Sequence, residues 1–353
     1  MKILASLGPL SIKSGSLVHW AHSIDLSESG QIIAIKAQRG AIDGNLLVEL
    51  CGLSNDYKEL LRQRKACVVY EWTEEAELCQ PVIDQIEIFC KAESIDLDLF
   101  WYLTGNHSFT GHQINIRPVP LYIAVASWAI PLDEDILQRK THPFLCLMRN
   151  PHTHRWVTLL ELYNTGLLYK GLVSFSGTHE DYATYHGPRL DPLLLSKLPL
   201  IVDIPTKNYD PRVQWNSGLG ARLYQITHFS LVVESHIDRV HLTEKICKPL
   251  AYGHPFMVIG GQYYLRTLRS LGFQTFGQWW DESYDTIISD SERIHAVVTL
   301  TQKVSEWSDS TWSNFHDASH SVTTHNKELI RSEKFMHKVL DILEEIRIPI
   351  LKN

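Results

Sequence analysis

The sequence predicts an α/β protein built from two doubly wound parallel sheets, each in a domain of its own. Three observations carry this prediction. Short apolar runs of strand length alternate with segments of helical spacing, and both halves of the chain show this alternation. The length of 353 residues is enough for two domains that each bury a core.

In the first half, strands are expected in five apolar or β-branched runs, at residues 1–7, 31–38, 66–72, 99–105 and 121–127. Residues 57–65 and 80–94 lie between these runs and have the spacing of helices. Because a helix returns the chain to the starting edge of a sheet, strands that alternate with helices form parallel sheets. The polar segment 131–143, with a proline at each end, then suits an exposed connection between domains.

The second half opens with a clear strand, helix and strand, expected over residues 144–149, 152–163 and 171–177. Asn150 is a favoured N-cap residue, Pro151 suits the first helical position, and Gly166 is typical of a helix end. Later strands are expected over 223–235 and 255–261, and later helices from Thr243 and over 262–272, 291–307, 310–320 and 326–348.

These elements divide the chain into Rossmann-like domains over residues 1–138 and 139–325. A C-terminal helix over 326–353 can cross back to the first domain. Its apolar stripe is expected to comprise Ile330, Phe335, Val339, Ile342 and Ile346.

Composition excludes several classes of protein. The net charge of -7 and the pI near 6.2 argue against a broad electrostatic surface for nucleic acid or an anionic membrane. The six cysteines form no CxxC pair and lie mostly in apolar runs, which favours reduced core thiols. No window approaches the length of a membrane span, and the N-terminus lacks the apolar region of a signal peptide. We therefore expect a cytoplasmic protein.

Basic residues gather where the first strand of the second half meets its helix. Arg149, His152, His154 and Arg155 would add charge to the unpaired N–H groups at the helix N-terminus. Two arginines can fork onto a pyrophosphate. The alternative is a solvated basic helix start whose arginines pair with surface carboxylates.

A second candidate group lies at the helix that starts at Thr243. Thr243 is an expected N-cap, and Lys245 in the first turn would suit an anion above the helix end. Glu244 can accept hydrogen bonds from hydroxyl groups. The alternative is an ordinary acidic first turn beside an exposed lysine. Glu234, which ends a strand that is otherwise apolar, favours a functional interpretation because a purely structural strand rarely carries a carboxylate there.

The run from Val233-Glu234-Ser235 through Thr243-Glu244-Lys245 to Gly253-His254-Pro255-Phe256 resembles the donor-binding half of GT-B glycosyltransferases, in which two Rossmann-like domains face a cleft. It is most similar to the α-1,3-fucosyltransferase-like group, although that group has Glu-Asn-Ser where this chain has Glu-Ser. The resemblance covers about residues 142–300. The segments LGFQTF and DESYD (Asp281–Asp285) also resemble uncharacterised bacterial and viral proteins with this domain.

The resemblance implies a metal-independent glycosyltransferase without a cofactor. It would move a sugar from a nucleotide-sugar, GDP- or UDP-linked, to the hydroxyl of a glycan or another acceptor. Residues 139–325 would bind the donor and residues 1–138 the acceptor. The expected donor-binding residues are Arg149, His154, Arg155, Glu234, Ser235, Thr243, Glu244 and Lys245, with Arg149 or Arg155 on the phosphates.

The acceptor hydroxyl needs a base, which we expect in the first domain. Glu74 and Glu75 follow one predicted strand, and Asn106 and His107 follow another, at the sheet edge where catalytic groups of open α/β sheets lie. Of these, Glu74, Glu75 and His107 are the candidate bases.

Other functions stay open. The chain could modify hydroxylated DNA bases, as some phage glycosyltransferases of this architecture do, although the acidic pI disfavours a nucleic-acid partner. It could also be a non-catalytic nucleotide-binding module. A zinc-dependent hydrolase would use His316, Asp317 and His320 with His325 nearby, but a polar surface is favoured for these residues. For Trp279 and Trp280, a place in the core is favoured over stacking on a ligand.

Overall fold

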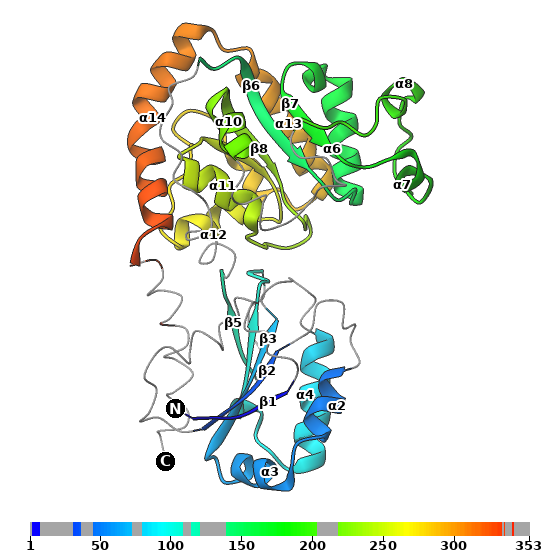
Figure 1. Cartoon of the computed structure of the whole chain (residues 1–353), viewed down its shortest axis with the longest axis vertical. Coiled ribbons are helices and arrows are strands. Elements are labelled where there is room, and N and C mark those ends of the chain that lie inside the picture. The colour runs from blue at the N-terminus through cyan, green and yellow to red at the C-terminus, as the bar shows by residue number, and fades with distance from the viewer. Residues whose placement is uncertain are drawn as a thin grey trace. The chain divides into compact units, whose positions relative to one another are not determined.

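The computed structural model describes residues 2–7, 31–36, 45–72, 80–108, 114–120, 139–202, 218–333, 335 and 341. The chain divides into two compact units, one of Met1–Val125 with Glu333–Asn353 and the other of Ala126–Ser332. Figure 1 shows the elements of each unit. The predicted domain limits stay predictions, because residues 121–138 and most of 334–353 lie outside the described residues.

The first unit contains a parallel sheet of five described strands. They are β1 (Lys2–Leu7), β2 (Gln31–Lys36), β3 (Ala66–Trp72), β4 (Phe100–Thr104) and β5 (Asn115–Pro118), and they pair in this order. Four of these strands match predictions. β5 was not predicted because Asn115, Arg117 and Pro118 give its four residues no apolar pattern. The strand expected over 121–127 lies outside the described residues.

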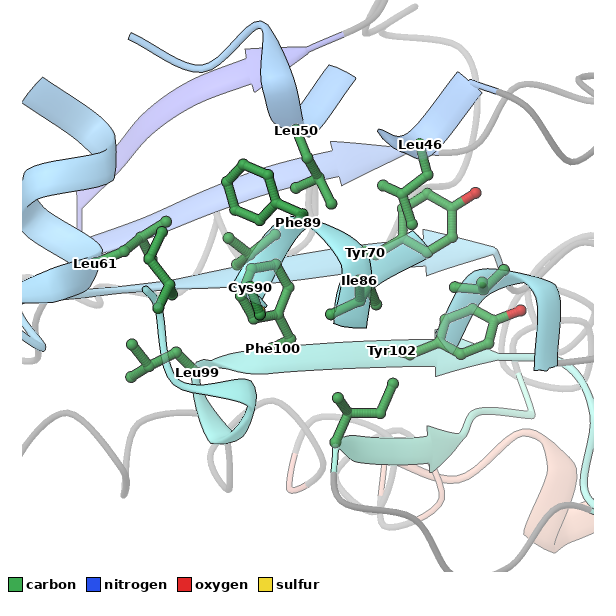
Figure 2. Packing of buried hydrophobic residues seen from close by; sticks show 14 of the residues in the cluster. Leu46, Leu50, Leu61, Tyr70, Ile86, Phe89, Cys90, Leu99, Phe100 and Tyr102 are labelled. Carbon is green, nitrogen blue, oxygen red and sulfur yellow. The ribbon is translucent and has the colours of Figure 1, made fainter. Parts of the chain in front are cut away.

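The helices of this unit pack on the sheet through one apolar cluster. They are α2 (Asn45–Cys51), α3 (Asn55–Arg62), α4 (Gln80–Glu93) and the 3-10 helix η1 (Leu97–Leu99). Figure 1 shows α2 and α4 on one side of the sheet. Figure 2 shows the packing, in which Leu50 and Phe89 from the helices meet Phe100 from the sheet. Burial of these side chains is the main stabilising force of such a layer.

The second unit contains a four-stranded parallel sheet with the order β7-β6-β8-β9. Its strands are β6 (His142–Met148), β7 (Leu172–Phe175), β8 (Thr227–Val233) and β9 (Phe256–Ile259). The chain passes from β6 outward to β7 and then returns across β6 to β8. The winding direction therefore reverses between β6 and β8, the position where open α/β sheets bind ligands. The predicted α/β class with two parallel sheets is confirmed.

Eight helices and two 3-10 helices are described in this unit. They are α6 (Thr153–Asn164), η2 (Leu167–Tyr169), α7 (His179–Ala183), α8 (Pro192–Leu195), α10 (Gly218–Gln225), α11 (Glu244–Tyr252), α12 (Tyr264–Ser270), η4 (Ser283–Thr286), α13 (Asp290–Ser305) and α14 (Asp309–Ile330). The outer edge of β7 carries a short antiparallel bridge, in which Phe175 and Leu200 exchange backbone hydrogen bonds of 2.7 and 2.9 Å. No helix among the described residues is long and apolar enough to cross a bilayer.

Helix α6 begins later than predicted. The N-cap is His152, not Asn150, and Thr153 is the first helical residue, so Pro151 lies before the helix. The reason is a turn in which the Asn150 carbonyl accepts hydrogen bonds from the His152 N–H and the Arg155 Nη1, both at 2.9 Å. The predicted end is correct, because Gly166 follows the last turn in the left-handed conformation with φ of 73°.

Helix α14 is continuous where two separate helices were expected. Its polar stretch around residues 321–325 suggested a break, but the buried stripe of the helix runs through it. The stripe comprises Trp312, Phe315, Ser319, Val322, Asn326 and Ile330. Asn326 is tolerated in it because its amide donates to the Gln274 carbonyl at 2.9 Å and accepts from the Gln274 N–H at 2.8 Å. Val339, Ile342 and Ile346 of the predicted apolar stripe lie outside the described residues.

Trp280 lies in the core, as favoured from the sequence. It is 5% exposed, and its ring centroid lies 5.3 Å from those of Phe276 and Phe315. Trp279 is half-buried and meets the Phe315 ring edge-on at 5.5 Å. Because Phe315 belongs to α14, these aromatic contacts attach the helix to the rest of the second unit. Of the described cysteines, four are buried free thiols, as expected: Cys67, Cys90, Cys146 and Cys247.

Candidate functional site

The two predicted donor-binding segments meet at the carboxyl ends of β6 and β8. The turn before α6 follows β6, and Glu234 and Ser235 follow β8 directly. The Nε2 of His154 lies 2.8 Å from the backbone oxygen of Glu234, although the two residues are far apart in the sequence. This contact places the N-terminus of α6 beside the end of β8, where the winding direction of the sheet reverses.

Glu234 has a buried carboxylate that joins three parts of the chain. Its side chain is 1% exposed, Oε1 accepts from the Tyr264 hydroxyl at 2.5 Å, and Oε2 accepts from the Thr243 hydroxyl at 2.5 Å. The Ser235 N–H lies 3.3 Å from Oε2. Burial raises the pKa of Glu234, while Lys245 and the two hydroxyl hydrogen bonds oppose this rise. Protein hydroxyl groups therefore donate hydrogen bonds to both carboxylate oxygens of Glu234.

Arg155 is likewise an internal residue. It is 1% exposed, and its guanidinium donates to the backbone oxygens of Asn150 at 2.9 Å, Val233 at 3.2 Å and Glu234 at 3.0 Å. The predicted fork onto a pyrophosphate would require these hydrogen bonds to break. Arg155 therefore ties the first turn of α6 to the end of β8.

His154 is also buried, and burial lowers its pKa to about 4. Its imidazole is therefore neutral at pH 7, and Nε2 must carry the hydrogen because a carbonyl oxygen can only accept. Arg149, the other arginine of the predicted phosphate pair, is half-buried at the end of β6. Its backbone oxygen accepts a hydrogen bond from the Ser176 hydroxyl.

The N-terminus of α11 has the predicted cap. The Thr243 side chain accepts a hydrogen bond from the Lys245 N–H at 3.3 Å. The Lys245 Nζ lies 2.7 Å from Glu244 Oε1, 3.0 Å from Ser235 Oγ and 3.4 Å from Thr243 Oγ1. The side chains of Lys245 and Glu244 stay 19% and 30% exposed, so this cluster is reachable from solvent.

The Glu244 carboxyl and the two imidazoles beside it have shifted pKa values. Burial alone would raise the pKa of Glu244, but the Lys245 ammonium and its hydrogen bond lower it to about 2. Burial lowers the pKa of His236 to about 4 and that of His152 below its ordinary value. These imidazoles are therefore neutral at pH 7. A cation, an anion and a hydroxyl thus stand together at a helix N-terminus, beside the N-terminus of α6, which has no side-chain cap.

Three further residues support the loop between Ser235 and Thr243. Gly261 packs so closely that a Cβ there would lie 2.2 Å from the Arg239 carbonyl carbon. Arg293, 2% exposed, donates to the backbone oxygens of Ile237 at 2.6 Å and Gly260 at 2.8 Å. Tyr264 reaches the same region through Glu234.

Sequence reasoning missed these three residues as parts of the site. The glycine pair that follows an apolar strand was the signal for a close backbone approach at Gly261. Arg293 and Tyr264 carry no such local signal, since the groups through which they reach this region, on Ile237, Gly260 and Glu234, lie 30 or more residues away in the sequence.

The candidate bases belong to the other unit. Glu74 and Glu75 lie outside the described residues. His107 follows β4, is half-buried, and has a pKa lowered to about 4 by burial, so its imidazole is neutral at pH 7.

The C-terminal histidines that were considered as zinc ligands lie within hydrogen-bond distance of other side chains. The His316 Nε2 lies 2.9 Å from the His228 Nδ1, and the His320 Nε2 lies 3.5 Å from the Thr324 hydroxyl. Within the described part of the chain, no three His, Cys, Asp or Glu side chains gather closely enough to hold one metal ion.

No protein-family model matches the sequence, and no curated protein matches it. Among solved structures, the chain is similar to one described as the crystal structure of an α1,3-fucosyltransferase. The two share 10% sequence identity with a TM-score of 0.38, and the match covers 89% of this chain and 78% of that chain. A similarity of this size does not assign an activity.

Proposed function

We propose that the protein is a glycosyltransferase that moves a sugar from a nucleotide-sugar to an acceptor hydroxyl. One observation carries the proposal: the Lys245 ammonium lies 3.0 Å from the Ser235 hydroxyl at the point where the sheet reverses its winding. The N-terminal ends of α6 and α11 both lie at this edge, where their N–H groups favour an anion. The resemblance of residues 233–256 to the donor-binding half of fucosyltransferase-like enzymes supports the same reading.

The residues of the site take two kinds of role in this proposal. Lys245 and Ser235 contact the diphosphate, Arg149 adds charge at the end of β6, and Glu244 accepts from hydroxyls of the ribose or the sugar. Four buried residues position these groups through internal hydrogen bonds and do not contact the donor: Glu234, Thr243, His154 and Arg155. This division departs from the sequence-based expectation that all eight side chains contact the donor.

The reaction would displace a nucleoside diphosphate from the anomeric carbon of the sugar. The acceptor oxygen forms the new bond, and the negative charge that develops on the leaving diphosphate is stabilised by Lys245 and the helix N–H groups. A base from the first unit takes the acceptor proton, and Glu74, Glu75 and His107 are the candidates. The donor is GDP- or UDP-linked, the acceptor is a glycan or another hydroxylated molecule, and neither a metal nor a cofactor takes part.

Calorimetric titration with GDP and with UDP, each with and without EDTA, tests the donor site. We expect one of them to bind in both conditions, and Lys245→Ala to weaken that binding at least tenfold, since a charged hydrogen bond to phosphate is lost. Glu244→Ala should lower turnover of the matching nucleotide-sugar. Lys303→Ala is the matched control, because Lys303 is an exposed lysine in the last turn of α13.

The results separate the candidate functions. Hydrolysis or transfer of the donor sugar in EDTA supports the transferase. Tight binding of a nucleotide without any turnover supports the non-catalytic nucleotide-binding module. Equal affinity of the wild type and Lys245→Ala for both nucleotides contradicts the placement of the diphosphate.

A further inference from the structure

The Thr243 hydroxyl stands between a buried carboxylate and the lysine of the site. Its oxygen lies 2.5 Å from Glu234 Oε2, 3.3 Å from the Lys245 N–H nitrogen and 3.4 Å from the Lys245 Nζ. A hydroxyl has one hydrogen and two lone pairs, whereas both groups of Lys245 can only donate. The hydrogen of Thr243 therefore goes to Glu234, and the lone pairs face Lys245.

The carboxylate itself is held from its other side by Tyr264. The Tyr264 hydroxyl donates to Glu234 Oε1 at 2.5 Å, and the ring is 2% exposed. Tyr264 begins α12, whose first turn is fixed by Asp285, because that carboxylate accepts from the N–H groups of Leu265 at 2.7 Å and Arg266 at 3.0 Å. A rigid donor on α12 thus sets the rotation of the Glu234 carboxylate.

Lys245 experiences two competing attractions. Glu244 draws the ammonium at 2.7 Å from the same helical turn, while Thr243 and Ser235 hold it toward the end of β8. The lone pairs of Thr243 add an attraction toward the end of β8, beside the shorter contact of the ammonium with Ser235. If the Thr243 hydroxyl turned its hydrogen toward Lys245, that attraction would become a repulsion.

We propose that Tyr264, Glu234 and Thr243 form a hydrogen-bonded relay that positions the Lys245 ammonium for binding of the donor diphosphate. Tyr264 is then a positioning residue that acts through Glu234 and never touches the donor. The inference rests on the proposed function, since it assigns the diphosphate to Lys245.

A double-mutant cycle tests the relay with GDP and UDP as probes. We expect Tyr264→Phe to weaken binding of the preferred nucleotide about tenfold in the wild type but less than twofold in Lys245→Ala, because the relay acts only through that lysine. Tyr284→Phe is the matched control, as Tyr284 is a buried tyrosine of the same unit outside the relay, and it should leave affinity within twofold. A merely structural tyrosine would weaken binding equally in both backgrounds, which overturns the relay.

A second pair of variants keeps the test decisive if Tyr264→Phe folds poorly. Thr243→Ser retains the hydroxyl and should keep the wild-type affinity, whereas Thr243→Val should lose about tenfold. Equal affinities of these two variants contradict the relay. If Lys245→Ala binds both nucleotides as well as the wild type, the diphosphate site is misplaced and the relay falls with it. A different result, in which Lys245→Ala weakens nucleotide binding but Tyr264→Phe leaves it unchanged, refutes the relay alone.

Discussion

The substitution Gly261→Ala should destabilise the second unit more than any ordinary surface change. A Cβ at residue 261 would lie 2.2 Å from the carbonyl carbon of Arg239, 2.3 Å from its oxygen and 2.6 Å from the Val240 nitrogen. An ordinary contact begins near 3.4 Å, so the loop would have to retreat by more than 1 Å. All three obstacles are backbone atoms, which cannot rotate aside as a side chain can.

The loop has little freedom to retreat. Arg293 bonds the carbonyl of Ile237 on the loop and the carbonyl of Gly260 beside the glycine, so both sides of the contact are held by one buried guanidinium. Overpacking of a rigid interior costs about 1 to 3 kcal/mol, and a clash with backbone belongs at the upper end. We therefore expect a loss of about 3 kcal/mol, which lowers the melting temperature of a domain of this size by about 6 to 12 °C.

Thermal and urea unfolding, followed by circular dichroism, measure this loss. Gly277→Ala is the matched control, since its Cβ would meet only the end of the Glu282 side chain, at 3.1 Å, and should cost less than about 1 kcal/mol. Melting of the two variants within a degree of each other would refute the reasoning, because it would show that the 235–243 loop yields freely.

Two other perturbations test the buried Asn326 of α14 and the neutral imidazole of His154. Asn326→Leu should destabilise the protein by about 2 kcal/mol, because it removes both hydrogen bonds that the buried Asn326 amide makes with the Gln274 backbone. The exposed Asn314→Leu on the same helix should change stability by less than about 0.5 kcal/mol, and urea unfolding distinguishes the two variants. The folded pKa of His154 is about 4, below its ordinary value of 6.5, so the stability it confers is complete above pH 6.5 and falls as the pH drops toward 4. At pH 5 the loss should reach about 2 kcal/mol, and His154→Gln should remove that part of the acid sensitivity; parallel unfolding curves of the wild type and the variant between pH 7.5 and 5 would contradict it.

The end of β8 and the start of α11 were readable from the sequence, but the start of α6 and the direction of side chains were not. The run of apolar residues before Glu234 and the Thr243 cap predicted where β8 ends and α11 begins, and the structure brings these points together. The sequence does not tell whether a polar residue at a strand end turns inward or toward solvent. Glu234 and Arg155 turn inward because they form hydrogen bonds with a hydroxyl and a carbonyl group, respectively, from distant segments of the chain.

The same limit explains the residues that were missed. Neither Tyr264 nor Arg293 was singled out from the sequence. Their roles depend on partners 30 or more residues away in the chain, as the separation between Tyr264 and Glu234 illustrates. Helix α14 was divided at residues 321–325, which are mostly polar, whereas the structure buries Val322 and Asn326 on one side of a continuous helix. Asn326 is compatible with the core because the Gln274 backbone lies opposite it.

The bridge between Phe175 and Leu200 has a consequence for how the protein behaves at high concentration. An exposed sheet margin with free amide groups can recruit a strand from a neighbouring molecule and start aggregation. In β7, a strand of four residues, two residues direct their backbone groups outward, and Phe175 is one of them. Leu200 pairs with the outward backbone groups of Phe175. The rest of the β7 edge is therefore too short to template an intermolecular sheet there.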